Sequence, residues 1–346
     1  MKIFYGVQGT GNGHITRARA IAQKLNERKV DVDWLFTGRP RDQFFEMEVF
    51  GDWAWREGLT FATSHGNIHY LRTAIGNNLL RFISDIRSLE LEKYDLIVTD
   101  FEPVTAWAAK IKGLKTVGIG HQYAFGLDIP IAGRDYLGLQ ILKYFAPATV
   151  GLGVHWHHFN GAILPPIIET KAPQSTQVSN KIIVYLPFED IHDVIDILAP
   201  FRGHEFHVYN PGGAVGNSEK TPHIQVKGLS RKGFQQDFSD CTGVICNAGF
   251  ELPSEALHMG KKLLVKPLHG QIEQLSNALA LHQLSLAEVM HDLDPATIES
   301  WLAKETRHLI RFPDVAALVV EWLMEGNLTV DPTWIRNVWD RCEKIS

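Results

Sequence analysis

The sequence predicts an α/β protein made of two doubly wound, Rossmann-like domains that face each other across a cleft. Strand and helix signals alternate through both halves of the chain, which is typical of parallel sheets covered by helices on both faces. A polar, proline-rich segment, PPIIETKAPQSTQVSN, separates the halves at residues 165–180. The 346 residues, with 45% hydrophobic and 21% charged side chains, are enough for two domains that each bury a core.

The first half repeats a short apolar strand followed by a helix with apolar residues at helical spacing. Strands are predicted at Lys2–Gln8, Val32–Thr37, Leu96–Asp100 and Thr116–Gly120, and helices at Thr16–Arg28, Asp42–Phe50, Leu79–Lys93 and Val104–Lys112. We therefore expect residues 1–165 to form the first domain.

The pattern starts again after residues 166–180, which we interpret as an interdomain linker. Strands are predicted at Ile182–Pro187, Glu205–Tyr209, Ile224–Val226, Gly243–Cys246 and Lys262–Val265, and helices at Glu189–Leu198, Arg231–Phe238, Glu251–Met259 and Gln271–His282. Residues 181–311 should form the second domain. Two further helices, predicted at Pro313–Glu325 and Pro332–Cys342, lie in the terminal segment 312–346.

Composition excludes several classes of protein. The formal net charge of −5 lacks the basic excess of a dedicated nucleic-acid binder, so we expect no nucleic-acid partner. Three cysteines without a CxxC pair or zinc-ligand spacing suit a reducing cytosol and predict no metal site. No signal peptide and no apolar run of about 20 residues is recognisable. We expect a cytoplasmic protein, and a peripheral position at the inner membrane face stays open.

A glycine-rich loop, GTGNGH, joins the first predicted strand to the first helix at residues 9–14. Gly11 and Gly13 allow the backbone to approach a ligand, and the helix N-terminus behind them favours an anion. The spacing is neither the GxGxxG dinucleotide fingerprint nor a P-loop. His14 should project from the carboxyl edge of the sheet, where an imidazole can act as a general base near neutral pH.

Two acidic residues follow another strand of the same predicted sheet. Asp100 ends the strand and Glu102 comes two residues later. Either carboxylate could hold the His14 imidazole in its productive tautomer, and the sequence leaves both open. A satisfied polar histidine and a plain structural turn are the alternative interpretation of this loop.

The segment Asn247 to Ala278, NAGFELPSEALHMGKKLLVKPLHGQIEQLSNA, predicts a ligand site in the second half. Small residues at Asn247-Ala248-Gly249 open a helix and permit close approach to phosphate. Glu251 and Glu255 are four residues apart and share one helix face, where a carboxylate can accept hydrogen bonds from a ribose diol. Polar side chains suited to sugar hydroxyls follow the next strand, namely His269, Gln271, Glu273, Gln274 and Asn277. A capped helix with an exposed polar loop would explain each residue singly.

Together these motifs make the chain resemble the GT-B glycosyltransferases, and most closely a bacterial and archaeal family similar to MurG, the N-acetylglucosaminyltransferase of peptidoglycan synthesis. The resemblance covers nearly the whole chain. It rests on Gly9, Gly11, Gly13 and His14, and on the later pattern of Gly, SE, a Gly-Lys turn, a strand, Pro, EQ and NA. Asn247-Ala248 departs from the plant-type enzymes, which carry a histidine and glycines there.

The resemblance implies that the C-terminal domain grips a nucleotide sugar and the N-terminal domain holds the acceptor. It implies that Glu255 binds the ribose, that Gly249 and Phe250 lie at the diphosphate, and that Leu229 and Ser230 cover the base. It also implies that Glu273, Gln274 and Asn277 reach the donor sugar. The fold class further allows the terminal segment 312–346 to cross back to the first domain.

The reaction that follows is direct displacement with inversion, from a donor expected to be a UDP-sugar, without a metal or other cofactor. His14 would deprotonate an acceptor hydroxyl on a sugar, lipid-linked or other molecule. Candidate acceptor loops are Ser64–Arg72 and His121–Asp128. A UDP-sugar epimerase of the same architecture and a non-catalytic nucleotide-sugar-binding or partner subunit remain alternatives. A nicotinamide oxidoreductase is disfavoured because the dinucleotide fingerprint fails.

Overall fold

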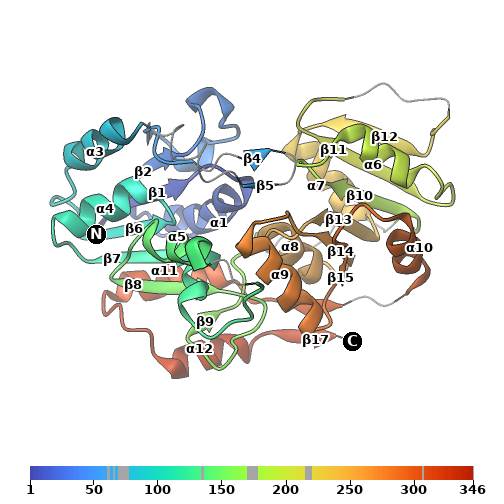
Figure 1. Ribbon diagram of the computed structural model, residues 1–346. Helices are drawn as coiled ribbons and strands as arrows, with labels where there is room; N and C mark the ends of the chain where they lie inside the picture. Colours follow the sequence, from blue (N-terminus) through green and yellow to red (C-terminus); the bar gives the residue numbers. More distant parts are fainter. Residues whose placement is uncertain are drawn as a thin grey trace.

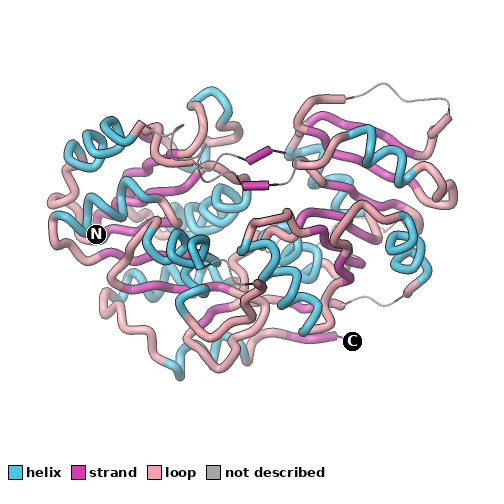
Figure 2. The backbone as a smooth tube through the Cα atoms, in the orientation of Figure 1, coloured by secondary structure: helices cyan, strands magenta, loops and turns pink. Residues whose placement is uncertain are grey.

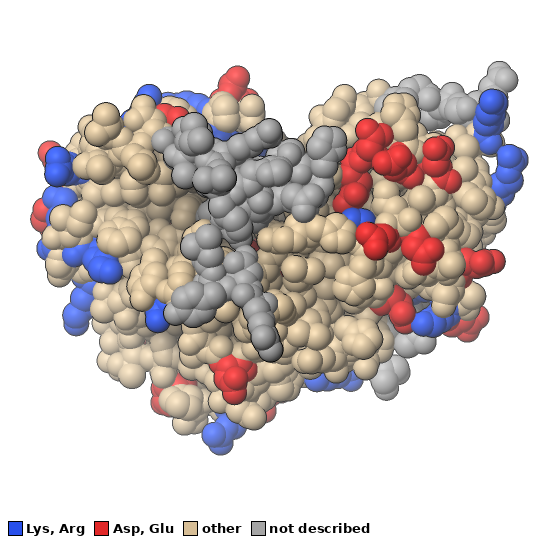
Figure 3. Space-filling view, in the orientation of Figure 1, with Lys and Arg blue, Asp and Glu red and all other residues tan. Residues whose placement is uncertain are grey.

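A computed structural model gives the protein as two lobes with a notch between them (Figures 1 and 3). It describes residues 1–60, 63–64, 67–68, 78–133, 136–169, 178–214, 220–305 and 308–345. Each lobe holds one parallel sheet between helices (Figure 2). The sheets contain seven and six strands, so the chain is an α/β protein with the doubly wound architecture that the alternating pattern predicts.

The N-terminal sheet has the strand order β3-β2-β1-β6-β7-β8-β9, and its strands are parallel. Alternate residues of β1 point to opposite faces, so Ile3 and Tyr5 pack toward helix α1 while Phe4 packs toward helices α3 and α4. The strands are β1 (Lys2–Gln8), β2 (Asp31–Thr37), β3 (Trp53–Trp55), β6 (Leu96–Asp100), β7 (Thr116–Gly120), β8 (Val150–Val154) and β9 (Ile163–Leu164). The helices are α1 (Asn12–Glu27), α3 (Leu79–Ser88), α4 (Pro103–Ile111) and α5 (Tyr136–Tyr144), with a 3₁₀ turn η3 (His121–Gly126) and a small hairpin of β4 (Thr63–Ser64) and β5 (Asn67–Ile68).

One predicted helix of this domain is wrong. Residues 42–50 form no α-helix but two short 3₁₀ turns, η1 (Arg41–Gln43) and η2 (Glu48–Phe50). Glu46 between them has a φ of +52°, a left-handed conformation that a right-handed helix cannot contain. Phe44 and Phe50 are still buried, because both turn toward Phe36 of the sheet. The apolar spacing therefore predicted correctly that these side chains are buried, but the helical backbone that it predicted is wrong.

The C-terminal sheet has the order β12-β11-β10-β13-β14-β15, again with parallel pairing. Its strands are β10 (Lys181–Tyr185), β11 (Glu205–Asn210), β12 (Ile224–Gly228), β13 (Gly243–Asn247), β14 (Lys262–Lys266) and β15 (Glu288–Val289). Its helices are α6 (Ile191–Leu198), α7 (Arg231–Asp240), α8 (Glu251–His258), α9 (Ile272–Gln283) and α10 (Pro295–Ala303). The carboxyl ends of β10 and β13 lead directly into Leu186–Phe188 and Asn247–Phe250, the segments that border the notch.

The chain passes between the lobes more than once. Of the predicted linker 166–180, residues 170–177 lie outside the described part of the chain. After β16 (Leu309–Arg311), helix α11 (Val315–Glu325) packs on α1, where Lys24 and Asp314 form an ion pair of 2.8 Å. Helix α12 (Pro332–Trp339) follows, and Trp339 donates to the carbonyl of Ile163 at 2.7 Å. A last strand, β17 (Glu343–Ile345), returns and pairs antiparallel with β16.

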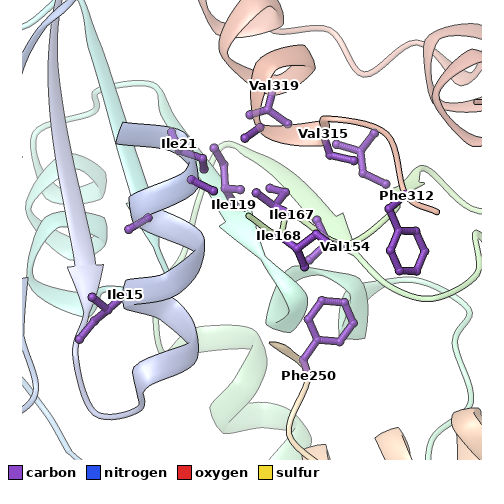
Figure 4. Packing of buried hydrophobic residues seen from close by; sticks show 14 of the residues in the cluster. Ile15, Ile21, Ile119, Val154, Ile167, Ile168, Phe250, Phe312, Val315 and Val319 are labelled. Atoms are coloured by element: carbon purple, nitrogen blue, oxygen red, sulfur yellow. The ribbon is translucent and has the colours of Figure 1, made fainter. Parts of the chain in front are cut away.

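A continuous apolar core joins the two lobes. The chain first passes between the lobes near Ile167 and Ile168 and passes back near Phe312 and Val315. Figure 4 shows these two segments beside each other, with Phe250 nearby. Trp156, which follows β8 and is 1% exposed, packs its ring at a tilt against that of Phe250, with centroids 4.8 Å apart, and donates to Ser254 Oγ at 2.8 Å. These contacts bury side chains of both domains together, so the structure is a closed arrangement of the lobes. Among the described helices, none has the length and apolar character needed to cross a membrane.

Trp156 is expected to stabilise this closed arrangement strongly. Trp156→Ala should lower the free energy of unfolding by about 3–5 kcal/mol, because a large buried ring is replaced by a cavity. Trp156→Phe keeps an apolar ring and loses the hydrogen bond to Ser254, which should cost about 1 kcal/mol for the bond together with a smaller packing loss. Urea denaturation of the three proteins checks the order, and a loss under 1 kcal/mol in the alanine variant would contradict it.

Candidate active site

His14 and Asp100 meet at the carboxyl edge of the N-terminal sheet. Asp100 ends β6 and is fully buried, while His14 lies in the first turn of α1 and is 15% exposed. Their Nδ1 and Oδ1 atoms are 2.7 Å apart. Arg17 Nη2 is also 2.9 Å from Nδ1, but this nitrogen donates to Asp100 Oδ1 at 2.5 Å. With the Nδ1 proton directed at the Asp100 carboxylate, Nε2 is the acceptor. The pair therefore has the geometry of an oriented general base.

Arg17, one turn after His14 on α1, completes the cluster. Its Nε and Nη2 atoms donate to the two oxygens of Asp100 at 2.8 and 2.5 Å. Burial alone would raise the pKa of Asp100, but the Arg17 and His14 side chains outweigh it and hold this pKa below its ordinary value. Asp100 is therefore ionised at neutral pH and can keep the His14 ring in one tautomer.

The same arginine joins the two domains. Arg17 Nη1 donates to Glu251, the first residue of α8 in the C-terminal domain. Helices α1 and α8 touch between the lobes (Figure 1), and a Cβ placed on Gly13 would lie 2.5 Å from the Glu251 carboxylate. A side chain at position 13 would displace the Glu251 carboxylate from its present position. The absence of a side chain at Gly13 thus allows Glu251 to reach Arg17.

Glu102 does not orient His14, which was one of the two roles that the sequence left open. Its carboxylate caps α4, accepting from the backbone N–H groups of Val104 and Thr105, both at 2.7 Å. Thr37 also donates to it at 3.1 Å. Glu102 is fully buried and bound to the helix end, so the structure places Asp100, and not Glu102, against His14.

A cavity of about 940 Å³ lies between the domains; Gly13 and Glu251, which adjoin this cluster, line it, whereas His14, Arg17 and Asp100 do not. Most residues predicted for the donor site line it: Gly11, Gly13, Leu229, Ser230, Asn247, Gly249, Phe250, Glu251, Glu255 and Gln274. Its C-terminal wall also carries aromatic rings that the sequence did not single out, namely Tyr185, Phe188, Tyr209 and Phe234. The cavity has the volume and the mixed apolar and polar lining of a small-molecule site.

Glu255 projects into this cavity from α8, and no hydrogen-bond partner for it occurs in the described part of the protein. Burial raises its pKa to about 8, and the neighbouring Glu169 and Glu251 carboxylates add to the effect. The side chain is partly exposed at the cavity wall, so a ligand can reach its carboxyl. Hydroxyl donors of a ligand would satisfy it.

Three other predicted donor residues lie elsewhere. Asn277 is fully buried and bridges the domains, with its Oδ1 2.6 Å from His121 Nε2 and its Nδ2 donating to the Ala248 carbonyl at 3.0 Å. Glu273 accepts from Gln122 at 3.0 Å. His269 is exposed and 3.2 Å from Asp292. None of the three lines the cavity, and the structure therefore gives Asn277 and Glu273 interdomain contacts.

Two loops were predicted to hold the acceptor. Of Ser64–Arg72, residues 65–66 and 69–72 lie outside the described part of the chain. In His121–Asp128, His121 is fully buried and stacks on Phe250 at 4.1 Å. Burial lowers the pKa of His121 to about 4, so it is neutral at physiological pH. It joins the domains and is not exposed to an acceptor.

Arginines are the functional residues that sequence reasoning missed. Arg17 carried one usable signal, since it lies three residues after His14 and must share its helix face. Arg231 binds Glu169 through one nitrogen at 2.8 and 2.9 Å and lines the cavity with Arg19 and Arg39. Within the residues that the structure describes, no group of three or more His, Cys, Asp or Glu side chains could hold a metal ion.

The sequence matches glycosyl transferase family 1 over residues 1–131 and 148–305. The chain belongs to this family. It is therefore a glycosyltransferase, as its resemblance to such enzymes implied. No curated protein sequence matches the chain.

Solved structures of glycosyltransferases share the fold. The glycosyltransferase of kitacinnamycin superposes with a TM-score of 0.63 at 11% identity, over 94% of both chains. SsfS6 from Streptomyces sp. SF2575, complexed with thymidine diphosphate, gives 0.58 at 12% identity, over 94% of this chain and 96% of its own. MurG of Acinetobacter baumannii gives 0.52 at 16% identity, over 95% and 92%. The glycosyltransferase thus has the GT-B architecture.

The raised pKa of Glu255 predicts a pH-dependent stability difference. The folded protein keeps this proton to a pH of about 8, whereas the unfolded chain loses it near 4.5, so ionisation of the buried carboxyl lowers stability as pH rises through that window. Glu255→Gln removes the titration. Its melting temperature relative to the unaltered protein should increase between pH 5 and pH 8 and then stay level.

Thermal unfolding monitored by circular dichroism across this pH range measures the difference. Glu321→Gln is the matched control, because Glu321 is exposed on α11 and should show no such trend. A flat difference for Glu255→Gln would contradict the burial argument.

Proposed function

We propose that the glycosyltransferase moves a sugar from a nucleoside diphosphate donor to an acceptor hydroxyl by direct displacement with inversion. The contact between His14 and Asp100 is the main support for the proposal, because it would orient a base one residue from Gly13, which lines a cavity whose residues would suit a nucleotide. SsfS6 and the spinosyn rhamnosyltransferase SpnG, which share the fold, are both complexed with thymidine diphosphate. Thymidine and uridine donors are accordingly the first to test.

His14 would take the proton of the acceptor hydroxyl at Nε2 while the oxygen attacks the anomeric carbon. Asp100 stabilises the imidazolium that results, and Arg17 keeps Asp100 ionised throughout. The bond between the anomeric carbon and the diphosphate oxygen breaks on the opposite face, which inverts the configuration. No covalent intermediate with the protein is needed.

The C-terminal wall would bind the donor. Glu255 would accept hydrogen bonds from the ribose hydroxyls, and Leu229 with the aromatic rings around it would cover the base. The backbone of Gly249 and Phe250 at the start of α8 would approach the diphosphate, since a Cβ on Gly249 would meet no atom within 4 Å. Backbone N–H groups and arginine side chains can stabilise a departing diphosphate without a metal ion.

Nucleotide binding can be tested before the sugar is known. A bound nucleotide at about 100 times its dissociation constant should add about 2.7 kcal/mol of stability. We expect thermal shifts with UDP or TDP and smaller ones with the free nucleosides. Absence of a shift with every uridine and thymidine ligand would contradict the donor site. Incubation with the donor sugar alone then separates transfer from epimerisation, because only an epimerase converts the donor without an acceptor.

His14→Ala should lower kcat by about 10²- to 10⁴-fold, the usual contribution of a general base, and leave nucleotide affinity within about twofold. His269→Ala is the matched control, because His269 is exposed and lies outside the cavity. Release of nucleoside diphosphate with an identified donor and acceptor measures kcat, and proton NMR of the new glycosidic bond reads its configuration. Turnover of His14→Ala within a few fold of the unaltered enzyme would exclude His14 as the base.

A further inference from the structure

The cavity is lined by two arginines that have no role in the mechanism proposed above. Arg19 and Arg39 both line it from the N-terminal domain. Arg19 donates to the carbonyls of Phe45 and Glu46, and Arg39 donates to the Gly9 carbonyl and to Asn12 Oδ1 at 3.0 Å. Across the described ranges of the chain, neither forms an ion pair with a carboxylate. Burial lowers the pKa of both, which means that their surroundings disfavour the isolated cation.

Glu46, Glu48 and Glu169 partly offset the charge of Arg19, whereas no carboxylate acts on Arg39 in this way. Glu251 is bound by Arg17, and Glu169 is bound by Arg231. Glu255, whose pKa is raised to about 8 by burial, is largely uncharged at neutral pH. Arg19 is buried and Arg39 is half-buried, so a guanidinium there without a paired carboxylate is costly, and an anionic ligand would lower that cost.

The position of Arg39 indicates which anion it meets. Asn12, to which Arg39 donates, adjoins Gly13, and Gly13 contacts Glu251 at the start of α8. Arg39 lines the same cavity as Tyr185, the last residue of β10. Tyr185 pairs in register with Cys246, directly before the segment from Asn247 to Phe250. The guanidinium therefore lies across the cleft from the segment proposed to approach the diphosphate.

The C-terminal domain offers little positive charge of its own at that segment. Arg231, the arginine of that domain that lines the cavity, is already bound to Glu169. A cation from the opposite wall would supply the missing charge. Arginine suits this task, because its planar fork can donate two parallel hydrogen bonds to phosphate oxygens.

We propose that Arg39 binds the diphosphate of the nucleotide donor from the N-terminal domain, with Arg19 adding positive charge behind it. This inference rests on the proposed function and adds to it a contact from the domain that carries the base. The donor would then touch both lobes, so that its binding favours the closed arrangement in which His14, Arg17 and Glu251 meet.

Isothermal titration calorimetry of Arg39→Gln and Arg39→Lys with TDP, UDP, thymidine and uridine tests the assignment. Arg39→Gln should weaken binding of the diphosphates by about 10- to 100-fold, the usual loss for hydrogen bonds to a charged group, and leave the nucleosides within about twofold. Arg39→Lys keeps the charge and loses the fork, so it should fall between. The dependence of diphosphate affinity on salt should also be weaker in Arg39→Gln.

Arg41→Gln is the matched control. Arg41 lies two residues further along, its guanidinium 4.7 Å from the centre of the Trp53 ring, and it does not line the cavity. We expect unchanged diphosphate affinity in this variant. Thermal unfolding checks that each variant folds. If Arg39→Gln does not fold, Arg39→Lys decides the matter: a diphosphate affinity equal to that of the unaltered protein overturns the inference.

The remaining outcomes separate this inference from the proposed function. Equal diphosphate binding by Arg39→Gln and the unaltered protein overturns the inference alone. A parallel loss of nucleoside and diphosphate affinity also overturns it, because Arg39 would then only shape the cavity. Arg39→Gln could keep its affinity for nucleoside diphosphates and lose its affinity for inorganic pyrophosphate. Arg39 would then bind an anionic group of the acceptor, and its assignment to the donor diphosphate would be wrong. An unaltered protein that binds no nucleoside diphosphate overturns the proposed function, and this inference with it.

Discussion

The buried guanidinium of Arg17 holds the site together. It contacts Asp100 through two nitrogens and Glu251 through a third, so one side chain connects the carboxylate behind the base to the first residue of the donor-side helix. Removing it would leave both carboxylates without this counter-charge, one of them fully buried. Lysine could not replace it, because an ammonium cannot span three directions in one plane.

The wider architecture explains why these groups meet. In each parallel sheet, side chains at the carboxyl ends of the strands gather at one edge, and the two edges face each other across the cavity. The N-terminal edge carries His14 and Asp100, and the C-terminal edge carries the Asn247–Phe250 segment. Contacts such as those of Trp156 with Ser254 and His121 with Asn277 keep the edges in place. Polar residues at the interface therefore contribute to the assembly of the cavity as well as to its lining.

The sequence predicted the fold well, and most of the residues it singled out for donor binding line one cavity. Strands such as Lys2–Gln8 and Leu96–Asp100 have the predicted bounds, because buried parallel strands read as short apolar runs between clear breaks. The helix predicted at 42–50 failed at Glu46, whose left-handed backbone gives no local signal. Likewise, the sequence placed Asn277 beside a ligand, although it bonds to His121, 156 residues away. Partners that distant along the chain are set by domain closure, which periodicity and spacing do not encode.

The terminal segment limits how the two lobes can move. The polypeptide runs from the first lobe to the second near Ile168, back near Phe312, and over again after Trp339 to pair β17 with β16. The first two crossings lie side by side in one apolar cluster (Figure 4). Bodies joined by three connections cannot slide freely over one another, so the easy motion is a rotation about the line of the crossings. Shortening the chain before β17 would remove one connection and leave a looser joint, with the lobes less well aligned each time they close.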